Sequence, residues 1–315
     1  MSEDKILVIG SACVDVIINV DHIPASQEDI HPFSHRFALG GCAGNVAVMA
    51  KLIGADVTLA TPVGTGLFGD FVEKELTARD IPIYIRRDEE AGCCYCLVEP
   101  NGERTFMSVN GTEYIFSEDD MQQFEDTYYK YMYVCGLEIE ERTGNDLITY
   151  LERHRDSVLM YAPNSRGVLI EKEKTDRILA LSPILHLNEF EAAHLSGLMQ
   201  YEDAVSSGYI PNETVESSAA YLNEMTGNTV IITLGRYGAY IHEAEGERYY
   251  VPKFDTEVVN TIGAGDAHAG AVLSLLAKGL DMRQTAITAN KAAAAVVSVE
   301  SATLSKEQFE AAGIV

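Results

Sequence analysis

The sequence is poor in positive charge. Lysine and arginine together number 23 against 48 aspartate and glutamate residues, which leaves a net charge of −25 and a pI of about 4.6. Such a surface repels nucleic-acid phosphates and anionic lipid headgroups, and no basic patch with interleaved aromatic residues interrupts it. We therefore expect no nucleic-acid and no membrane partner, and any anion should be bound at a local site.

Long apolar runs are also missing. No stretch of about 18 apolar residues occurs, and the first five residues, Met1–Lys5, lack the basic region of a signal peptide. These absences predict a cytoplasmic protein.

Cysteine is scarce too, with six residues in a chain of 315, which does not suggest a disulfide framework. Cys93 and Cys96 form a Cys-x-x-Cys pair, but they lie in a strand-like segment and no second pair exists. We interpret them as buried thiols rather than as a metal or redox site. The sequence leaves open whether Cys13 or Cys42 is reactive.

Three common ligand motifs are absent or weak. No Gly-Lys dipeptide occurs, which excludes a Walker P-loop. His31 and His35 are four residues apart, but Pro32 disfavours the helix that would bring them to one face and so argues against a zinc site. The glycines of 64–69 match Gly-x-Gly-x-x-Gly with Asp88 further on, but they do not follow the first strand, so a dinucleotide site is disfavoured.

Strand-like and helical stretches alternate nearly throughout, and 47% of the residues are apolar. The alternation predicts an α/β fold with a doubly wound, mostly parallel sheet and helices on both faces. Expected strands include 56–63, 131–135, 158–162 and 249–259. Residues 21–38 are interpreted as a loop or part of a lid.

A hairpin pattern interrupts this alternation. Two alternating runs, 93–100 and 103–109, are joined by Asn101-Gly102, the dipeptide that type I′ turns prefer. Because a hairpin does not easily join a parallel sheet, we predict one domain over residues 1–315 with a small β lid from about 14–38 and 92–112. Arg104 on this hairpin is interpreted as a solvated edge residue rather than a contact for an anionic substrate.

The most informative stretch is Gly263-Ala264-Gly265-Asp266. It follows a strand-like run and opens an apolar helix that stops near Gly279. The first turn of a helix has unpaired N–H groups and a partial positive charge, and two glycines let an anion approach. Asp266 would repel that anion, unless it accepts a proton from a hydroxyl group that attacks a phosphate. Capping alone remains the alternative interpretation.

Two earlier stretches carry further polar residues at predicted strand ends. Asp15 is placed at or just beyond the end of the first strand, where ligands collect in open parallel sheets. Gly40 and Gly41 begin a stretch that ends at Asn45, just before a predicted helix over 46–53, and Asn45 offers both a donor and an acceptor to a polyol.

Taken in order, Gly-Gly-x-x-x-Asn, Asn-x-x-Glu and Gly-Ala-Gly-Asp resemble the motifs of the ribokinase-like (PfkB) carbohydrate kinases. The resemblance spans most of the chain. It implies an ATP-dependent kinase that phosphorylates a hydroxymethyl group of a sugar or related small molecule. It further implies that Gly263, Ala264 and Gly265 form the anion hole and that Asp266 is the catalytic base.

The resemblance also implies the substrate contacts. For the sugar these are Asp15, Gly40, Gly41, Asn45, Glu138 and Arg166, the last in a motif in which Ala162 replaces the family's usual aspartate. For the nucleotide they are Asn188, Thr233, Gly235 and Asn290. Glu191 would hold Mg²⁺ through water, and the lid would be the contact of a homodimer.

One departure concerns potassium. Asn260 stands where the family usually has an aspartate that helps to hold a monovalent cation. Because an amide carries one negative charge fewer, K⁺ activation is in doubt here.

Two alternatives remain open. Asn260-Thr261 and Val299-Glu300-Ser301-Ala302-Thr303 are also similar to pseudouridine kinases, which implies a nucleoside acceptor. A sugar sensor that kept the fold without catalysis is the other alternative, against which the retained Asp266 argues.

Overall fold

The computed structural model describes residues 4–100 and 104–315. Its centre is an eight-stranded sheet in the order β14-β13-β12-β11-β10-β9-β1-β4. The six parallel strands are β1 (Ile6–Ile9), β4 (Val57–Ala60), β9 (Tyr131–Cys135), β10 (Val158–Ala162), β11 (Ile184–Asn188) and β12 (Val230–Thr233). Two antiparallel strands, β13 (Ala239–His242) and β14 (Arg248–Val251), complete one edge.

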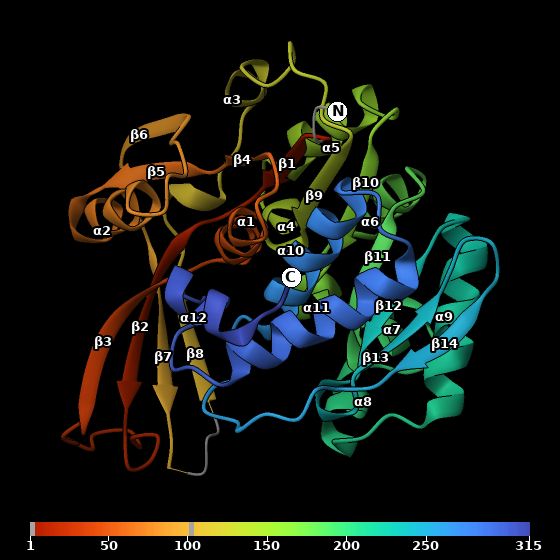
Figure 1. Ribbon diagram of the computed structural model, residues 1–315. Helices are drawn as coiled ribbons and strands as arrows, with labels where there is room; N and C mark the ends of the chain where they lie inside the picture. Colours follow the sequence, from red (N-terminus) through yellow and green to blue (C-terminus); the bar gives the residue numbers. More distant parts are fainter. Residues whose placement is uncertain (1–3, 101–103) are drawn as a thin grey trace.

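Helices cover both faces of this sheet (Figure 1). Side chains of β1 alternate between two cores: Ile6 and Val8 belong to one, and Leu7 and Ile9 to the other. The first core includes α1 (Cys42–Ile53), α10 (Ala264–Ala277), α11 (Met282–Val297) and α12 (Lys306–Ala312). The second includes α5 (Gly144–Arg153), α6 (Lys172–Leu179), α7 (Glu189–Leu195) and α9 (Asn212–Thr226). The predicted doubly wound fold is confirmed.

A separate four-stranded sheet, in the order β3-β2-β7-β8, extends beyond the body of the molecule (Figure 1). It consists of β2 (Cys13–Asn19), β3 (Ser34–Gly40), β7 (Cys93–Val98) and β8 (Arg104–Val109). Strands β7 and β8 pair antiparallel, as the hairpin pattern predicts. The Asn101-Gly102 turn lies outside the described residues.

Shorter elements complete the chain. A two-stranded sheet of β5 (Pro62–Thr65) and β6 (Ile85–Glu90) lies beside α2 (Gly66–Thr77). The remaining helices are α3 (Glu118–Gln122), α4 (Gly136–Glu140) and α8 (Tyr201–Ser207), with 3₁₀ turns η1 (Thr112–Tyr114), η2 (Ser165–Leu169) and η3 (Gly235–Tyr237). Within the described parts of the chain, we find no helix with the length and apolarity needed to cross a membrane.

Three expected segments differ from the structure. The strand expected at 56–63 is two strands, β4 and β5, because the chain changes sheets at Thr61, whose Oγ1 accepts a hydrogen bond from Ala12 N at 2.9 Å. The strand expected at 249–259 ends at Val251, since Pro252 has no N–H to continue the ladder. The loop expected at 21–38 contains the start of β3.

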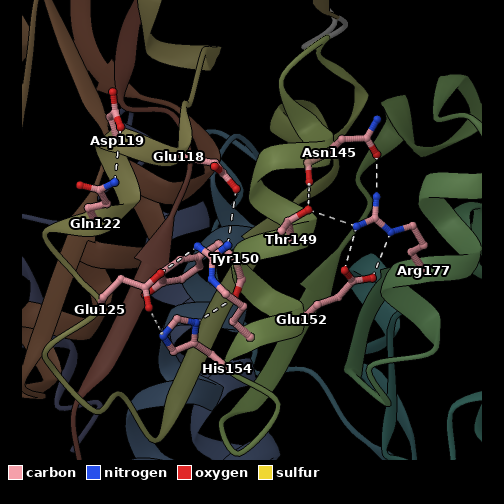
Figure 2. Close-up of polar contacts among 11 residues, drawn as sticks. Glu118, Asp119, Gln122, Glu125, Asn145, Thr149, Tyr150, Glu152, His154 and Arg177 are labelled. Atoms are coloured by element: carbon pink, nitrogen blue, oxygen red, sulfur yellow. Dashed lines mark hydrogen bonds and ion pairs between the residues drawn. The ribbon is translucent and has the colours of Figure 1, made fainter.

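A polar network on the molecule's outer side ties α3, α5 and α6 together (Figure 2). Arg177 on α6 donates to both carboxylate oxygens of Glu152 at 3.0 and 2.8 Å and to Asn145 Oδ1 at 2.8 Å. Arg153 on α5 pairs with Glu125 at 2.8 Å. This network includes none of the residues predicted for the site, so we assign it to helix packing.

Candidate active site

The first part of the site forms where the chain leaves the central strand β1. Gly10 follows the strand with a φ of 145°, and Gly41 precedes α1 with a φ of 84°. A Cβ atom at Gly41 would lie 2.4 Å from the carbonyl oxygen of Ser11, so both the space and the conformation require glycine. Gly44 N donates to the same Ser11 oxygen at 3.1 Å. This close contact places Asn45, in the first turn of α1, at the carboxyl end of β1.

The second part is the amino end of α10. Gly263 precedes the helix with a φ of 77°, and a Cβ atom there would lie 2.2 Å from the carbonyl oxygen of Ala302. In contrast, a Cβ atom at Gly265 would meet nothing within 4 Å. The first N–H groups of the helix lack intrahelical acceptors and carry the positive end of its dipole. This turn therefore offers both hydrogen-bond donors and open space to a phosphate.

Asp266 joins the two parts. Its Oδ2 accepts a hydrogen bond from Asn45 Nδ2 at 2.9 Å. Asp15, which lies within β2 rather than at the end of β1, is close enough for the charge of Asp266 to raise its pKa. Gly40 leaves room for this carboxylate, because a Cβ atom there would lie 2.3 Å from Asp15 Oδ2. Residues from three separate stretches of the sequence thus meet at one place.

Burial changes the ionisation of both aspartates. Burial raises the pKa of Asp266 from 3.8 to about 6, although hydrogen bonds from Asn45 and Cys42 oppose the rise. Burial and then the charge of Asp266 raise the pKa of Asp15 to about 7, and Arg36 opposes this. Asp266 is therefore mostly ionised at neutral pH while keeping the basicity that a proton acceptor needs.

Glu138, on α4, is fully buried. Its Oε1 accepts from Ser11 N at 2.7 Å, and its Oε2 accepts from the Cys135 thiol at 2.7 Å. Burial raises the pKa of Glu138, and its charge in turn contributes to the raised pKa of Asp266. In this geometry Glu138 supports the loop after β1, and both of its oxygens are engaged within the protein.

A cavity of about 440 Å³ adjoins the first turn of α10. All four residues predicted to contact the nucleotide line it, and they come from β11, β12, η3 and α11: Asn188, Thr233, Gly235 and Asn290. Gly265 lines it as well. Its size lies within the range of small-molecule sites.

The side chain of Asn290 fixes the wall of this cavity. Its Nδ2 donates to the carbonyl oxygens of Val251 and Pro252 at 3.1 and 3.0 Å. Asn290 therefore holds the segment that follows β14 rather than pointing a free amide at a ligand.

A second cavity of about 120 Å³ is lined by Gly265, Asp266 and Glu191 among others, and it shares Asn188 and Thr233 with the first. Asn188 caps α7, and Glu191 in its first turn accepts from Asn188 N at 3.0 Å and Nδ2 at 2.8 Å. Burial raises the pKa of Glu191 to about 7. Asn188 and Glu191 therefore form the cap of α7 and also line this cavity.

The carboxylates of Glu191 and Asp266 fit a hydrated magnesium ion. Among the described residues no cluster of three or more His, Cys, Asp or Glu side chains could enclose a metal. Mg²⁺ keeps several waters and commonly binds through one or two carboxylates plus phosphate oxygens. Glu191 and Asp266, which line one polar cavity, provide such a donor set.

Two other predicted residues are engaged elsewhere. The guanidinium group of Arg166 pairs with both carboxylate oxygens of Glu140 and lines neither cavity described above. Asn260 donates through Nδ2 to the carbonyl oxygen of Glu300 at 2.7 Å and accepts from Ile262 N at 2.8 Å. Ala162, the residue that departs from the family's motif before Arg166, lines the smaller cavity.

Arg104 also differs from the expectation of a solvated edge residue. Its Nη1 donates to Thr261 Oγ1 at 2.8 Å, and Thr261 lies just before the turn at Gly263. Burial lowers the pKa of Arg104, and its Nε is buried without a partner. The hairpin of the small sheet therefore contacts the loop that precedes α10.

Gly64 and Gly69 pack against protein, whereas Gly66 is exposed. A Cβ atom at Gly69 would lie 2.1 Å from the carbonyl oxygen of Gly64. They connect β5 to α2, outside the main sheet.

Sequence reasoning did not identify Cys42 and Asn164 as site residues. Cys42, the first residue of α1, forms a hydrogen bond that lowers the pKa of Asp266. Asn164 lines the 120 Å³ cavity and donates to Cys42 Sγ at 3.4 Å. Burial raises the pKa of Cys13, and a hydrogen bond to Cys135 followed by burial raises the pKa of Cys42, so neither thiol has the ionised character of a reactive cysteine.

This fold, with a buried carboxylate beside an open helix N-terminus, is typical of a phosphotransferase with an alcohol acceptor. Residues 3–308 match the model for the pfkB family carbohydrate kinases, and the chain belongs to this family. The chain is 29% identical over 94% of its length to the uncharacterized sugar kinase YegV of Escherichia coli (strain K12), of which it covers 89%. It is 27% identical over 86% of its length to ribokinase of Mus musculus, of which it covers 81%.

Solved structures agree in fold. The structure of Arabidopsis thaliana ribokinase complexed with ribose and ATP has a TM-score of 0.80 at 18% identity and covers 99% of each chain. The Burkholderia thailandensis nucleoside kinase in complex with inosine has a TM-score of 0.74 at 17% identity and covers 98% of this chain and 95% of that one. The ribokinase-like fold is thus shared by relatives with sugar and with nucleoside ligands.

Proposed function

We propose that this protein is an ATP-dependent kinase that phosphorylates a hydroxymethyl group of a sugar or a related small molecule. The observation that carries the proposal is the position of Asp266. Its carboxylate bonds to Asn45, lies near Asp15, and stands one residue from the open turn at Gly265. An acceptor alcohol and a transferable phosphoryl group can therefore approach the same carboxylate.

The acceptor would be held by Asp15, Asn45 and the backbone of Gly40 and Gly41. Asn45 Oδ1 is buried and has no hydrogen-bond partner, which leaves an acceptor for a hydroxyl group. Asp15 is 8% exposed and faces Gly40, so its carboxylate can accept further alcohol hydrogens. Hydrogen bonds to buried groups of this kind are a strong source of specificity for polyols.

ATP would occupy the 440 Å³ cavity, with its phosphates directed to the first turn of α10. As the acceptor oxygen attacks the γ-phosphorus, Asp266 takes the hydroxyl proton and ADP leaves. The backbone of Gly263, Ala264 and Gly265 would stabilise the charge that develops on the transferred group, with Gly265 the most open of the three. Bound Mg²⁺, held through water by Glu191, would neutralise part of the phosphate charge.

The surroundings of Asn260 do not fit a monovalent cation. A potassium ion needs oxygen lone pairs in place of its hydration shell. Here the Glu300 carbonyl oxygen accepts from both Asn260 and Arg36, and Asn260 Oδ1 accepts from Ile262 N. We therefore propose activity without K⁺.

The decisive experiment is an acceptor screen that measures ADP formation and confirms the phosphorylated product by mass spectrometry. Pentoses, hexoses, keto-deoxy acids and nucleosides including pseudouridine form the panel, and reactions without acceptor form the control. We expect acceptor-dependent ADP formation with a sugar. Turnover with nucleosides alone would favour the nucleoside kinase, and binding of a sugar without turnover would favour the sensor.

We further propose that the small sheet forms the contact of a homodimer. Its outer strand β8 carries three apolar side chains that are more than half exposed: Phe106, Met107 and Val109. Sedimentation velocity should give the mass of two chains, and a Met107→Glu variant should shift the species toward the monomer.

A further inference from the structure

Tyr133 carries a hydroxyl group that the protein leaves unpaired. The residue lies in the middle of β9, is fully buried, and its hydroxyl has no hydrogen-bond partner among the described residues. Its neighbours in register on the adjacent strands are Val8 and Met160, both apolar and fully buried. Packing of this row of the sheet therefore does not require a hydroxyl. Because a buried hydroxyl without a partner destabilises the folded chain, a ligand that accepts its hydrogen would account for the residue.

The position of Tyr133 indicates which ligand this is. Tyr133 lines the cavity of about 120 Å³ that Asp266 also lines. This cavity shares Gly265, Asn188 and Thr233 with the 440 Å³ cavity assigned above to ATP, so the two cavities adjoin at the first turn of α10. The part of ATP that would enter the smaller cavity is the γ-phosphoryl group, because this group has to reach the acceptor oxygen next to Asp266.

The smaller cavity offers a phosphate few other side-chain donors. The described residues that line it include no lysine and no arginine, and two of them are carboxylates, Glu191 and Asp266. Its other polar side chains each have a hydrogen-bond partner in the protein: Asn164, His186, Asn188 and Thr233. Among the described lining residues, Tyr133 is therefore the polar side chain whose donor is still available.

We propose that the hydroxyl group of Tyr133 donates a hydrogen bond to a γ-phosphate oxygen of ATP, both in the bound nucleotide and during transfer. This proposal rests on the nucleotide site proposed above. A phenol is protonated at neutral pH, so it supplies a donor without a charge. A hydrogen bond to a charged oxygen is stronger than one between neutral groups. Tyr133 would thus favour the phosphoryl group in a cavity whose two carboxylates oppose it.

The test compares Tyr133→Phe with Tyr150→Phe. Tyr150 on α5 (Figure 2) is the matched control, because it too is fully buried, its hydroxyl finds no partner in the described chain, and it lines neither cavity. Each substitution keeps the ring and removes an unpaired hydroxyl, so each should raise the melting temperature of the ligand-free protein by roughly 1–3 °C. Tyr150→Phe should leave nucleotide binding and kinetics unchanged.

Nucleotide binding distinguishes a ligand contact from packing. Calorimetric titration with Mg²⁺ and without acceptor gives the Kd of ADP and of the β,γ-imido analogue of ATP, which keeps its γ-phosphate. In Tyr133→Phe the Kd of the analogue should rise by roughly five- to fiftyfold, while the Kd of ADP should change by less than about twofold. The kcat/KM for ATP should fall by at least as much as the analogue's affinity, with little change in the acceptor KM.

The proposal would be overturned by an analogue affinity within about twofold of the wild type, or by an equal loss for ADP. A lowered melting temperature of Tyr133→Phe would also overturn it, because the hydroxyl would then have a partner in the protein. A wild type that binds neither nucleotide would contradict this proposal and the kinase proposal together. A wild type that binds the analogue through Tyr133 but forms no ADP with any acceptor would contradict the kinase proposal alone.

Discussion

The two halves of the site are built differently. On the proposed acceptor side, Asp266 accepts a hydrogen bond from Asn45 and its charge raises the pKa of Asp15, against which Gly40 is packed. On the proposed nucleotide side, a cavity of about 440 Å³ is lined by small residues together with large ones such as Phe190 and Phe254, and Asn290 on its wall donates to backbone carbonyls of the protein.

This contrast suggests how the two halves contribute to turnover. A preformed acceptor side fixes the geometry of the reacting groups, which affects the chemical step. An open nucleotide side supplies donors and space, which affects nucleotide binding and phosphate placement. Substitutions on the two sides should therefore separate into effects on kcat and effects on the KM for ATP.

The largest effect is expected on the acceptor side. Asp266→Asn keeps the shape of the side chain but removes the proton acceptor, so kcat should fall by about 10²–10⁴-fold with acceptor binding largely kept. Steady-state kinetics with the acceptor found in the screen, together with calorimetric titration of that acceptor, measures both quantities.

Asp70→Asn is the matched control, because Asp70 is exposed on α2 and the substitution changes the same charge. It should leave kcat unaltered. Full turnover by Asp266→Asn would refute the assignment of the base.

A smaller effect is expected from Gly265→Val on the nucleotide side. The new side chain meets no protein atom within 4 Å at its Cβ, so folding should be kept, but it fills the space in front of the first turn of α10. We expect kcat/KM for ATP to fall by roughly ten- to a hundredfold. ATP titrations at saturating acceptor give this value.

Ala311→Val on the exposed side of α12 adds comparable bulk away from the cavities and serves as the control. Unchanged ATP kinetics in Gly265→Val would show that phosphates do not approach this turn. The proposed nucleotide side of the site would then be contradicted.

The pH profile sharpens the acceptor side further. The pKa of Asp266 is raised from 3.8 to about 6, and the base must be unprotonated to accept the proton. The kcat should therefore rise with pH up to about 6 and then level, with roughly tenfold less activity at pH 5 than at the plateau. An acid limb near pH 4 would mean that the carboxylate is solvated and would contradict a buried base.

The sequence predicted the framework well because the framework depends on local patterns. Strands 131–135 and 158–162 have the predicted bounds, since both are short apolar runs buried on two faces. The turn at Gly263 and the start of α10 follow from glycines and small residues whose conformational demands are local.

The remaining features depend on contacts between distant segments. The backbone of Pro163 packs closely against Gly136, and the partner of Arg166 is Glu140, 26 residues away. A motif identifies such residue types but does not indicate where their side chains turn. The same limit explains why Asp15 was placed at the end of β1 and is found in β2, one strand further along the chain.

The smallest effect is expected from potassium, outside both halves. The amide of Asn260 and the guanidinium group of Arg36 donate to the Glu300 carbonyl oxygen, and Arg36 lies 3.8 Å from the Glu300 carboxylate. The guanidinium group of Arg36 already supplies positive charge at this carbonyl, so replacing K⁺ by Na⁺ at constant ionic strength should change kcat by less than about twofold. Asn260→Asp, which restores a carboxylate, is the comparison variant and should respond more strongly. Activation of the wild type by K⁺ by an order of magnitude would require Arg36 to leave the Glu300 carbonyl oxygen. The contact between Arg36 of the small sheet and the loop at Glu300 would then be absent from the active enzyme.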